Sequence, residues 1–214
     1  MSFENFLLLL SGVPATLAVT FGGLAIGAVL AFPLLALRNA PFWPVRVAVI
    51  LLIAVVRSVP PIVWLFLIFF SIGSGIFPIS PMQAALVGFG IIATVNIAEI
   101  YRAGLNAVHG GQHEAAQALN MNRMHGFVDI IAPQMFRVCT PMLATYAIGL
   151  LKDAAVASTI GVQDLTYQGN YITQQTYDGL SVMGFVGLLY IAISLPVAWL
   201  SRMADARVKR MVAL

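Results

Sequence analysis

Ionisable side chains stand within or at the ends of long apolar stretches of this sequence, where a charge is costly. Arg57 lies inside one such stretch, Glu99 and Arg102 lie near the end of a second, and Lys152 and Asp153 close a third. Charges at membrane depth are rare, and they either pair with one another or mark a pathway for ions or solutes. The chemistry that these residues suggest is recognition of a charged or zwitterionic solute.

Arg57 lies eleven residues after Arg46, which places it about 16 Å deeper along a helix. Pro60 and Pro61 break that helix one turn later and free backbone carbonyls, which are tolerated at such depth only beside protein or water. Two interpretations remain open. Either Arg57, the two prolines and Ile62 line a substrate pathway, or Arg57 is a structural side chain bonded to neighbouring carbonyls.

The other charges allow similar alternatives. Glu99 and Arg102 are three residues apart and share a helix face, so the sequence predicts a local, structural ion pair. Asn96, one turn deeper, is a candidate for the pathway. Lys152 and Asp153, together with the intramembrane arginine, carry charges complementary to both ends of a zwitterion. In the competing interpretation, these two residues hold a gate on the outer side.

Other kinds of site are not expected. His109 and His113 are four residues apart, but no third ligand lies near them, so we expect no metal site. No phosphate-binding Gly-x-x-x-x-Gly-Lys-Ser/Thr motif occurs, and the two lysines, Lys152 and Lys209, lie in other contexts. No basic patch interleaved with aromatics indicates nucleic-acid binding. The chain is therefore not expected to be an enzyme, to hydrolyse ATP or to bind a cofactor.

The elements that position these residues follow from composition. The 214 residues are 60% hydrophobic and 9% charged, with a mean hydropathy of +0.94, whereas a soluble domain carries about a quarter charged residues. Lipid must cover most of the surface, and a spanning helix needs about 20 apolar residues. We expect an all-α membrane protein with a single transmembrane domain over 1–214. Five helices are predicted, at about 12–37, 45–72, 82–106, 134–151 and 180–201.

Basic residues predict the orientation because Lys and Arg accumulate on the cytoplasmic side. They gather between the first two runs, between the third and fourth, and after the fifth: Arg38 and Arg46; Arg102, Arg123 and Arg137; and Arg202, Arg207, Lys209 and Arg210. Glu4, the loop 72–81 and the mainly acidic segment 152–179 fall on the other side. The sequence thus predicts a periplasmic N-terminus and a cytoplasmic C-terminus.

The cytoplasmic segment between the third and fourth runs is too polar to span a membrane. Its glycine pair, 110–111, is expected to end the preceding helix. Residues 114–119 favour a short helix with an acid in the first turn. Asn120 tolerates the left-handed conformation that closes a helix. A second short helix is expected over 124–131, with Pro133 opening the next membrane helix. The result is a helix–turn–helix on the inner membrane face.

These residues resemble the signature loop of ATP-binding cassette (ABC) importer permeases, through 114–116, Asn120, Ile131 and Pro133. Further segments resemble the polar amino acid branch of that family: 57–61, 98–104, 111–112 and 151–162. The chain departs from the family pattern at Asn120, where a glycine is usual, at Ala132, where a leucine is usual, and at Ser58-Val59, where Gly-Thr is usual.

The resemblance implies the type I importer permease fold, with loop 107–133 forming coupling helices that dock on an ATPase subunit. The residues implied in coupling are Gly111, Glu114, Ala115, Ala116, Leu119 and Asn120. It also implies a bacterial inner-membrane complex containing a second permease, identical or homologous, and two ATPases that carry ATP and Mg²⁺. A periplasmic or lipid-anchored binding protein would deliver a polar amino acid or a close analogue.

The alternative is a stand-alone secondary transporter or channel for small polar solutes. Such a protein would carry an ion-coupling residue in its pathway and internal inverted repeats. The sequence shows no such repeat.

Overall fold

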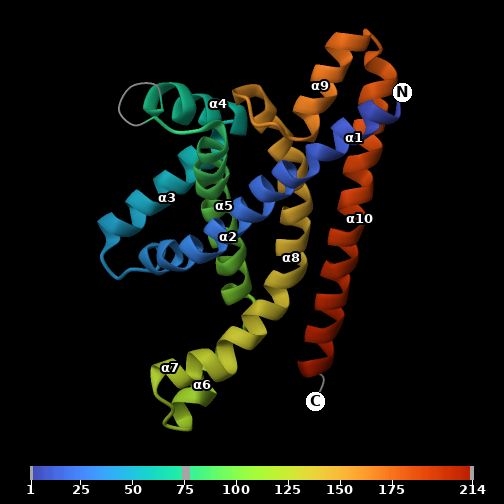
Figure 1. The fold of residues 1–214 in the computed structure, drawn as a ribbon. Helices are drawn as coiled ribbons and strands as arrows, with labels where there is room; N and C mark the ends of the chain where they lie inside the picture. Colours follow the sequence, from blue (N-terminus) through green and yellow to red (C-terminus); the bar gives the residue numbers. More distant parts are fainter. Residues whose placement is uncertain (1, 74–77, 213–214) are drawn as a thin grey trace.

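The computed structural model describes residues 2–73 and 78–212, and every regular element in them is helical (Figure 1). The first half contains α1 Phe3–Ser11, α2 Val13–Arg38, α3 Trp43–Ser58, α4 Pro61–Phe66, the π-helix η1 Leu67–Ile72 and α5 Pro81–Asn106. The second half contains α6 Gly110–Ala118, α7 Arg123–His125, the π-helix η2 Gly126–Ile131, α8 Ala132–Asp153, the 3₁₀ helix η3 Ala154–Ile160, α9 Leu165–Thr176 and α10 Gly179–Val212.

Four helical stretches in the described residues are long and apolar enough to cross a membrane: Phe3–Arg38, Pro81–Asn106, Arg123–Ile160 and Gly179–Trp199. A fifth crossing is possible if Trp43–Ser58 and Pro61–Ser71, which meet at an angle of 101°, count as one broken span. The span predicted over 45–72 is thus a pair of helices, and the break falls at Pro60 and Pro61, where the sequence predicted it. After the bend, α4 and η1 run across the end of α5 (Figure 1).

The centre of the bundle is the crossing of α2 and α5, where glycines let the two backbones approach. A Cβ on Gly27 would lie 2.5 Å from the Cβ of Ala93, and one on Gly23 would lie 3.1 Å from the Cβ of Phe89. Small residues at a helix interface in this way favour close packing within a membrane. Helix α8 packs against the same core through Met135, Cys139 and Leu150, all of them buried.

The segment 152–179, for which the sequence predicted no spanning helix, is mostly helical, in η3 Ala154–Ile160 and α9 Leu165–Thr176. Gly161, with φ of +94°, separates the two helices. Asp164 then caps α9, since its Oδ1 accepts from the backbone N–H of Tyr167 at 2.8 Å. The N–H of Leu165 donates to Oγ1 of Thr16 in α2, at 3.1 Å. These bonds hold α9 against the α1–α2 junction, near the top of the view in Figure 1.

The helix that contains α8 is longer than predicted at both ends. It continues from η2 without a break, so residues 123–160 form one candidate span of 38 residues. Pro133 therefore lies within a continuous helix, immediately after the π-helical turn. Helix α10 likewise extends beyond 201 to Val212. The structure describes no side chains for the predicted basic tail of Arg202, Arg207, Lys209 and Arg210, and residues 74–77 of the loop 72–81 lie outside the described residues.

Candidate functional site

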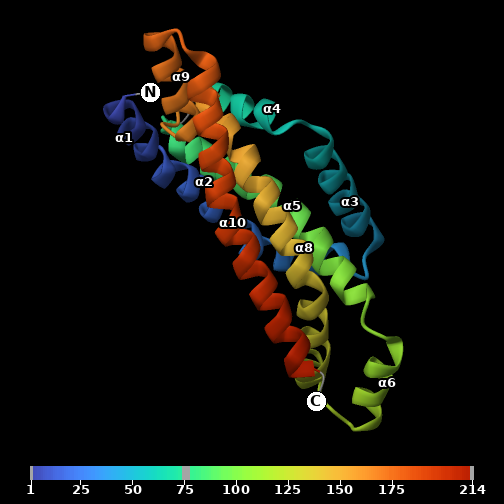
Figure 2. The ribbon, with the colours of Figure 1, turned by 90° about the vertical axis from the view of Figure 1, so that its right-hand side faces the viewer.

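Helices α6 and α7 project from one end of the bundle as a separate hairpin, seen at the bottom of Figure 1 and in profile in Figure 2. The glycine pair 110–111 begins α6 rather than ending α5, contrary to the prediction. The cause is His109, whose Nδ1 accepts from the N–H of Gly111 at 3.1 Å and so caps the helix. Glu114 consequently lies beyond the first turn of α6, which contains no acid.

The end of α6 is a Schellman motif centred on Asn120, which has φ of 51°. The N–H of Asn120 donates to the carbonyl of Gln117 at 2.9 Å, and the N–H of Met121 donates to the carbonyl of Ala116 at 3.0 Å. This is the pattern in which a left-handed residue satisfies the last carbonyls of a helix. The left-handed turn predicted at Asn120 is confirmed.

The surface of the hairpin carries most of the residues implied in coupling. Ala116 is buried, and its Cβ would lie 3.4 Å from a Cβ on Gly126, so small residues let α6 close on η2. Glu114, Ala115 and Asn120 are exposed, and Gly111 is half-buried. Apolar side chains also face outward at the tip, where Leu119 is 72% and Met124 70% exposed. Exposed apolar residues away from the membrane-spanning helices indicate a contact surface for another protein.

A cavity of about 400 Å³ lies on the inner side of this hairpin, lined in part by His113, Gln117, Arg123 and Phe127. No group of three or more His, Cys, Asp or Glu residues suited to a metal ion occurs among the described residues.

Arg57 lies in the last turn of α3 and is exposed. Pro60 and Pro61 follow it at the bend, with Ile62 36% exposed. Because Pro60 has no N–H to give to the carbonyl of Val56, that carbonyl needs another donor. The indole Nε1 of Trp64 supplies it, at 3.1 Å.

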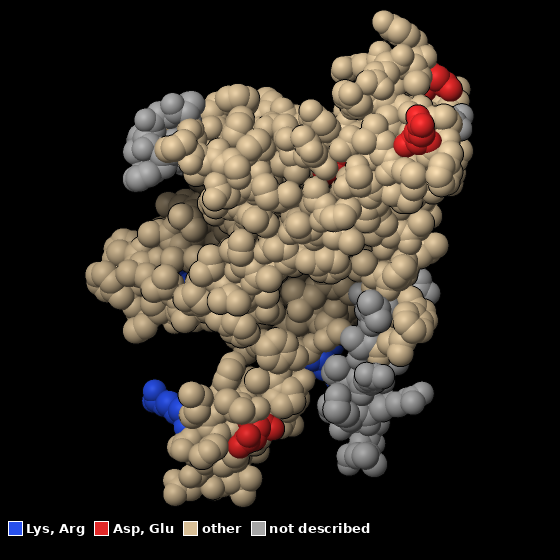
Figure 3. All heavy atoms as spheres, viewed as in Figure 1, with Lys and Arg blue, Asp and Glu red and all other residues tan. Residues whose placement is uncertain are grey.

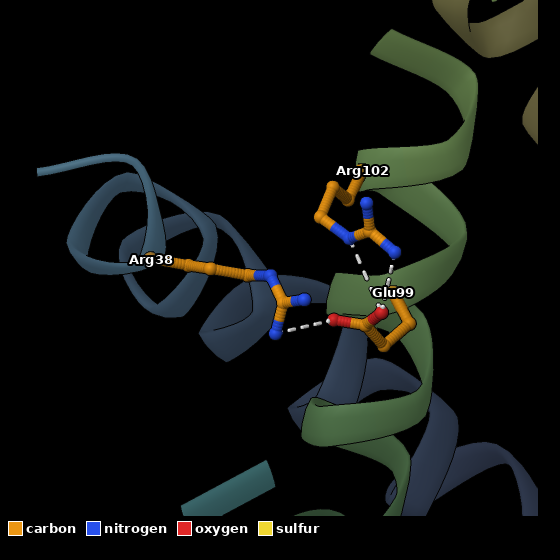
Figure 4. Close-up of polar contacts among 3 residues, drawn as sticks. All are labelled: Arg38, Glu99 and Arg102. Atoms are coloured by element: carbon orange, nitrogen blue, oxygen red, sulfur yellow. Dashed lines mark hydrogen bonds and ion pairs between the residues drawn. The ribbon is translucent and has the colours of Figure 1, made fainter. Parts of the chain in front are cut away.

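Glu99 of α5 pairs with two arginines, Arg102 on its own helix and Arg38 on α2 (Figure 4). Its Oε2 lies 3.0 Å from Nη2 of Arg102, within the pair that the sequence suggested. Its Oε1 lies 2.9 Å from Nη1 of Arg38, which reaches across from the end of α2. The contribution of Arg38 was missed, because no sequence pattern signals a contact between residues so far apart.

The structure brings Arg57 together with this cluster. A cavity of about 390 Å³ is lined by Arg38 from α2, by one face of α3 that includes Ile53, Arg57 and Ser58, and by Glu99 from α5. Two residues assigned to different roles from the sequence, Arg57 and Glu99, thus face one space. We call this space the three-helix cavity.

Lys152 does not line the three-helix cavity. It is exposed and lines a different cavity of about 280 Å³ between α8 and α10, with Tyr190 and Ser194. Asp153 is also exposed. The structure therefore separates the lysine from the intramembrane Arg57, with which the sequence had grouped it.

Asn96 lies on α5, half-buried, and its Nδ2 donates to the carbonyl of Ile92 at 2.8 Å. Its Oδ1 is left as an acceptor. Tyr146 of α8, which sequence reasoning did not single out, has a buried hydroxyl. Asn96 and Asp153 are the polar neighbours of that hydroxyl.

Comparison with known proteins agrees with this architecture. The model of the family "Binding-protein-dependent transport system inner membrane component" matches residues 23–210. The chain belongs to this family. Members are the non-enzymatic membrane components of ABC transporters, and the ATPase is a separate chain. This assignment excludes the interpretation as a stand-alone secondary transporter or channel.

Individual relatives span the permease almost completely. The probable amino-acid ABC transporter permease protein YckA of Bacillus subtilis is 30% identical, over 90% of this chain and 85% of the relative. The glutamine transport system permease protein GlnP of Escherichia coli K12 is also 30% identical, over 94% and 93%.

Solved structures give the same result. A crystal structure of an amino acid ABC transporter with histidines superposes with a TM-score of 0.87 at 28% identity, covering 97% of this chain and 99% of the other. An inward-facing MetNI methionine ABC transporter superposes with a TM-score of 0.82 at 22% identity, covering 97% and 99%, and supports the fold.

Proposed function

We propose that this permease is the subunit through which an ATP-driven importer moves polar amino acids or amino-acid-like solutes across the inner membrane of a bacterium. The single observation that carries the proposal is the α6–α7 hairpin. It is held away from the bundle and exposes apolar side chains outside the membrane-spanning segments. The relatives that match almost the full length of the chain are described as amino-acid and glutamine permeases, which supports the solute class.

The hairpin docks on the ATPase through α6 and the turn that follows it, at Gly111, Glu114, Ala115, Leu119 and Asn120. Ala116 is buried on the other face of α6, where it packs against η2. The helix that begins at Arg123 supports a mechanical link, because it continues for 38 residues to Ile160. Within it, α8 Ala132–Asp153 has 22 residues, which at 1.5 Å per residue is about 33 Å, and the π-helix η2 precedes it while the 3₁₀ helix η3 follows it. A displacement of the hairpin would therefore be transmitted to the opposite end of the bundle.

The orientation follows from the charges. In Figure 3 the basic side chains on the visible face lie in its lower half, and acidic groups lie both at the upper right and on the hairpin at the bottom. Since basic residues favour the cytoplasm, the hairpin and the end of α10 are cytoplasmic, and α9 and the N-terminus are periplasmic. The chain then forms one transmembrane domain with cytoplasmic coupling helices.

A complete transporter needs more than this chain. The partners are a second permease, identical or homologous, two ATPase subunits that bind ATP and Mg²⁺, and a periplasmic or lipid-anchored binding protein. The solute passes Arg57 and the bend at Pro60, Pro61 and Ile62. Asn96 of α5, and Lys152 and Asp153 at the end of α8, belong to other parts of the pathway, apart from Arg57. The Glu99–Arg102 pair steadies the end of α5 above the hairpin.

Photo-crosslinking tests the docking surface. Cys139, the single cysteine, is replaced by Ser, and Leu119→Cys is labelled with a benzophenone maleimide in the assembled complex. Val29→Cys on α2, which is 67% exposed, serves as the matched control on a membrane-spanning helix. We expect crosslinks to the ATPase from position 119 and none from position 29. Equal crosslinking from both positions, or none from 119 in a complex that still imports, would contradict the proposal.

Charge reversal on the hairpin tests coupling. We expect Glu114→Lys to lower ATP-driven uptake at least about tenfold, which corresponds to about 1.4 kcal/mol of docking free energy. The control is Glu4→Lys, an exposed acid at the other end of the molecule, which should import normally. Normal ATP-driven uptake by Glu114→Lys would argue against docking at α6.

A further inference from the structure

The three-helix cavity holds more positive than negative charge. Glu99 is its acidic side chain, and both of its carboxylate oxygens already face arginines, Arg38 at 2.9 Å and Arg102 at 3.0 Å. Arg57 lines the same cavity, and among the residues that the structure describes it forms no ion pair. Because arginine stays protonated in proteins, the space and its rim hold three positive charges, on Arg38, Arg57 and Arg102, and one negative charge, on Glu99.

Because the guanidinium of Arg57 is not paired within the described part of the chain, an anionic group that enters the cavity is stabilised there. A guanidinium binds a carboxylate through two parallel N–H bonds, which suits Arg57 to one end of an amino acid. The cavity has a volume of about 390 Å³ and is open to the surface, where Arg57 is exposed, so a small solute can enter it. Ile50 and Ile53 provide an apolar wall for the rest of the solute.

Acceptors for an ammonium group lie next to Arg57. The hydroxyl of Ser58 donates to the carbonyl of Ala54 at 2.7 Å, which leaves the lone pairs of its Oγ as acceptors. The carbonyl of Arg57 itself has lost its usual helical donor, since Pro61 carries no N–H. The cavity thus offers a cation for the carboxylate and neutral acceptors for the ammonium, whereas Glu99 is already neutralised.

We infer that the three-helix cavity binds the α-amino and α-carboxyl groups of an amino acid through Arg57, and that its excess positive charge excludes amino acids with a cationic side chain. This inference rests on the proposed import of amino acids and names which of them the site accepts: those with neutral or acidic side chains. Glu99 and Arg38, which pair with each other, then set the selectivity of the site as well as joining α2 to α5.

Equilibrium binding tests the inference in the permease–ATPase complex, reconstituted in nanodiscs of neutral phosphatidylcholine. Tritiated L-glutamine is the probe, and the competitors are L-glutamate, L-arginine and L-glutamine with its α-carboxylate blocked as an amide. We expect L-glutamate to compete, and L-arginine and the blocked compound to compete at least about tenfold more weakly. Arg57→Gln should weaken probe binding at least about tenfold, whereas Arg46→Gln, on α3 but outside the cavity, should not.

Three results of the binding experiment would contradict the inference. Unchanged binding by Arg57→Gln, competition by L-arginine as strong as that by L-glutamate, or failure of both glutamine and glutamate to bind would each overturn the inference. An anionic lipid shares the same charge chemistry. Phosphatidylglycerol retained only when Arg57 is present, with no competition by amino acids, would therefore also overturn it. ATP-driven amino acid uptake that is indifferent to Arg57 would refute this site alone, whereas absence of uptake for every amino acid would refute the proposed function.

Discussion

The carboxyl group of Asp164 gives a quantitative test of the packing at the end of the bundle opposite the hairpin. The side chain is fully buried between α9 and the start of α2, and its Oδ2 has no hydrogen-bond partner among the described residues. Burial raises the pKa of Asp164 from 3.8 to about 6, in opposition to backbone hydrogen bonds such as that from Tyr167, which lower it. Asp164→Asn keeps an acceptor for the α9 cap and removes the titration.

The direction and the size of the effect follow from linkage. A carboxyl group with a higher pKa in the folded state binds its proton more tightly there, so protonation favours folding. Stability should fall as the pH rises from about 4 to about 6 and level off above that. A rise in pKa from 3.8 to about 6 corresponds to about 3 kcal/mol.

Unfolding of the detergent-purified permease at pH 4, 5, 6 and 7, by SDS titration or thermal melting, measures this contribution. Other carboxyl groups titrate in the same range, so the informative quantity is the wild-type free energy of unfolding minus that of Asp164→Asn. We expect this difference to fall by about 2.4 kcal/mol between pH 4 and pH 7, which is most of the total. Parallel profiles for the two proteins would refute the burial argument.

Two further substitutions test the packing and the hairpin. Gly27→Ala places a Cβ 2.5 Å from that of Ala93, so α2 and α5 must separate, and we expect a loss of about 1–3 kcal/mol in unfolding measurements. Gly149→Ala, with nothing within 4 Å, is the control, and an equal loss there would contradict the packing argument. Asn120→Val, a β-branched residue at φ of 51°, should weaken the turn by about 1–2 kcal/mol and lower ATP-driven uptake, whereas Asn120→Gly should import normally. Equal uptake by the two variants would show that the left-handed turn is not needed.

The helices that cross the bundle were predictable from hydropathy, because lipid exposure requires long apolar runs. The proline pair at 60–61 likewise predicted the position of the bend. The angle of 101° was not predictable, since it depends on packing of α4 against α5 and η3. The Trp64 bond to the carbonyl of Val56 is likewise a tertiary contact that no local pattern reveals.

The segment 152–179 shows where hydropathy reasoning failed. It contains no run of about 20 apolar residues, the length that a spanning helix requires, so hydropathy predicted no helix there. Its helices are short and stabilised by contacts to distant residues, among them the bond from Leu165 to Thr16. Secondary structure that depends on such tertiary contacts leaves little trace in local composition.

The hairpin and the charged cluster were predictable in part. Asn120 was identified as a left-handed turn because few residues tolerate that conformation. The start of α6 was misplaced because the cap from His109 outweighs the helix-breaking tendency of the glycine pair. The contact of Arg38 with Glu99 joins two helices and became visible only in the folded chain.

The central claim is that this permease moves solute only as part of an ATP-driven complex, and one measurement tests it directly. Uptake of labelled L-glutamine and L-glutamate is followed in proteoliposomes that contain the permease alone or the full complex with its binding protein. ATP is then compared with an imposed proton or sodium gradient. The account predicts uptake by the full complex with ATP and none by the permease alone under either gradient. Gradient-driven uptake by the permease alone would contradict it.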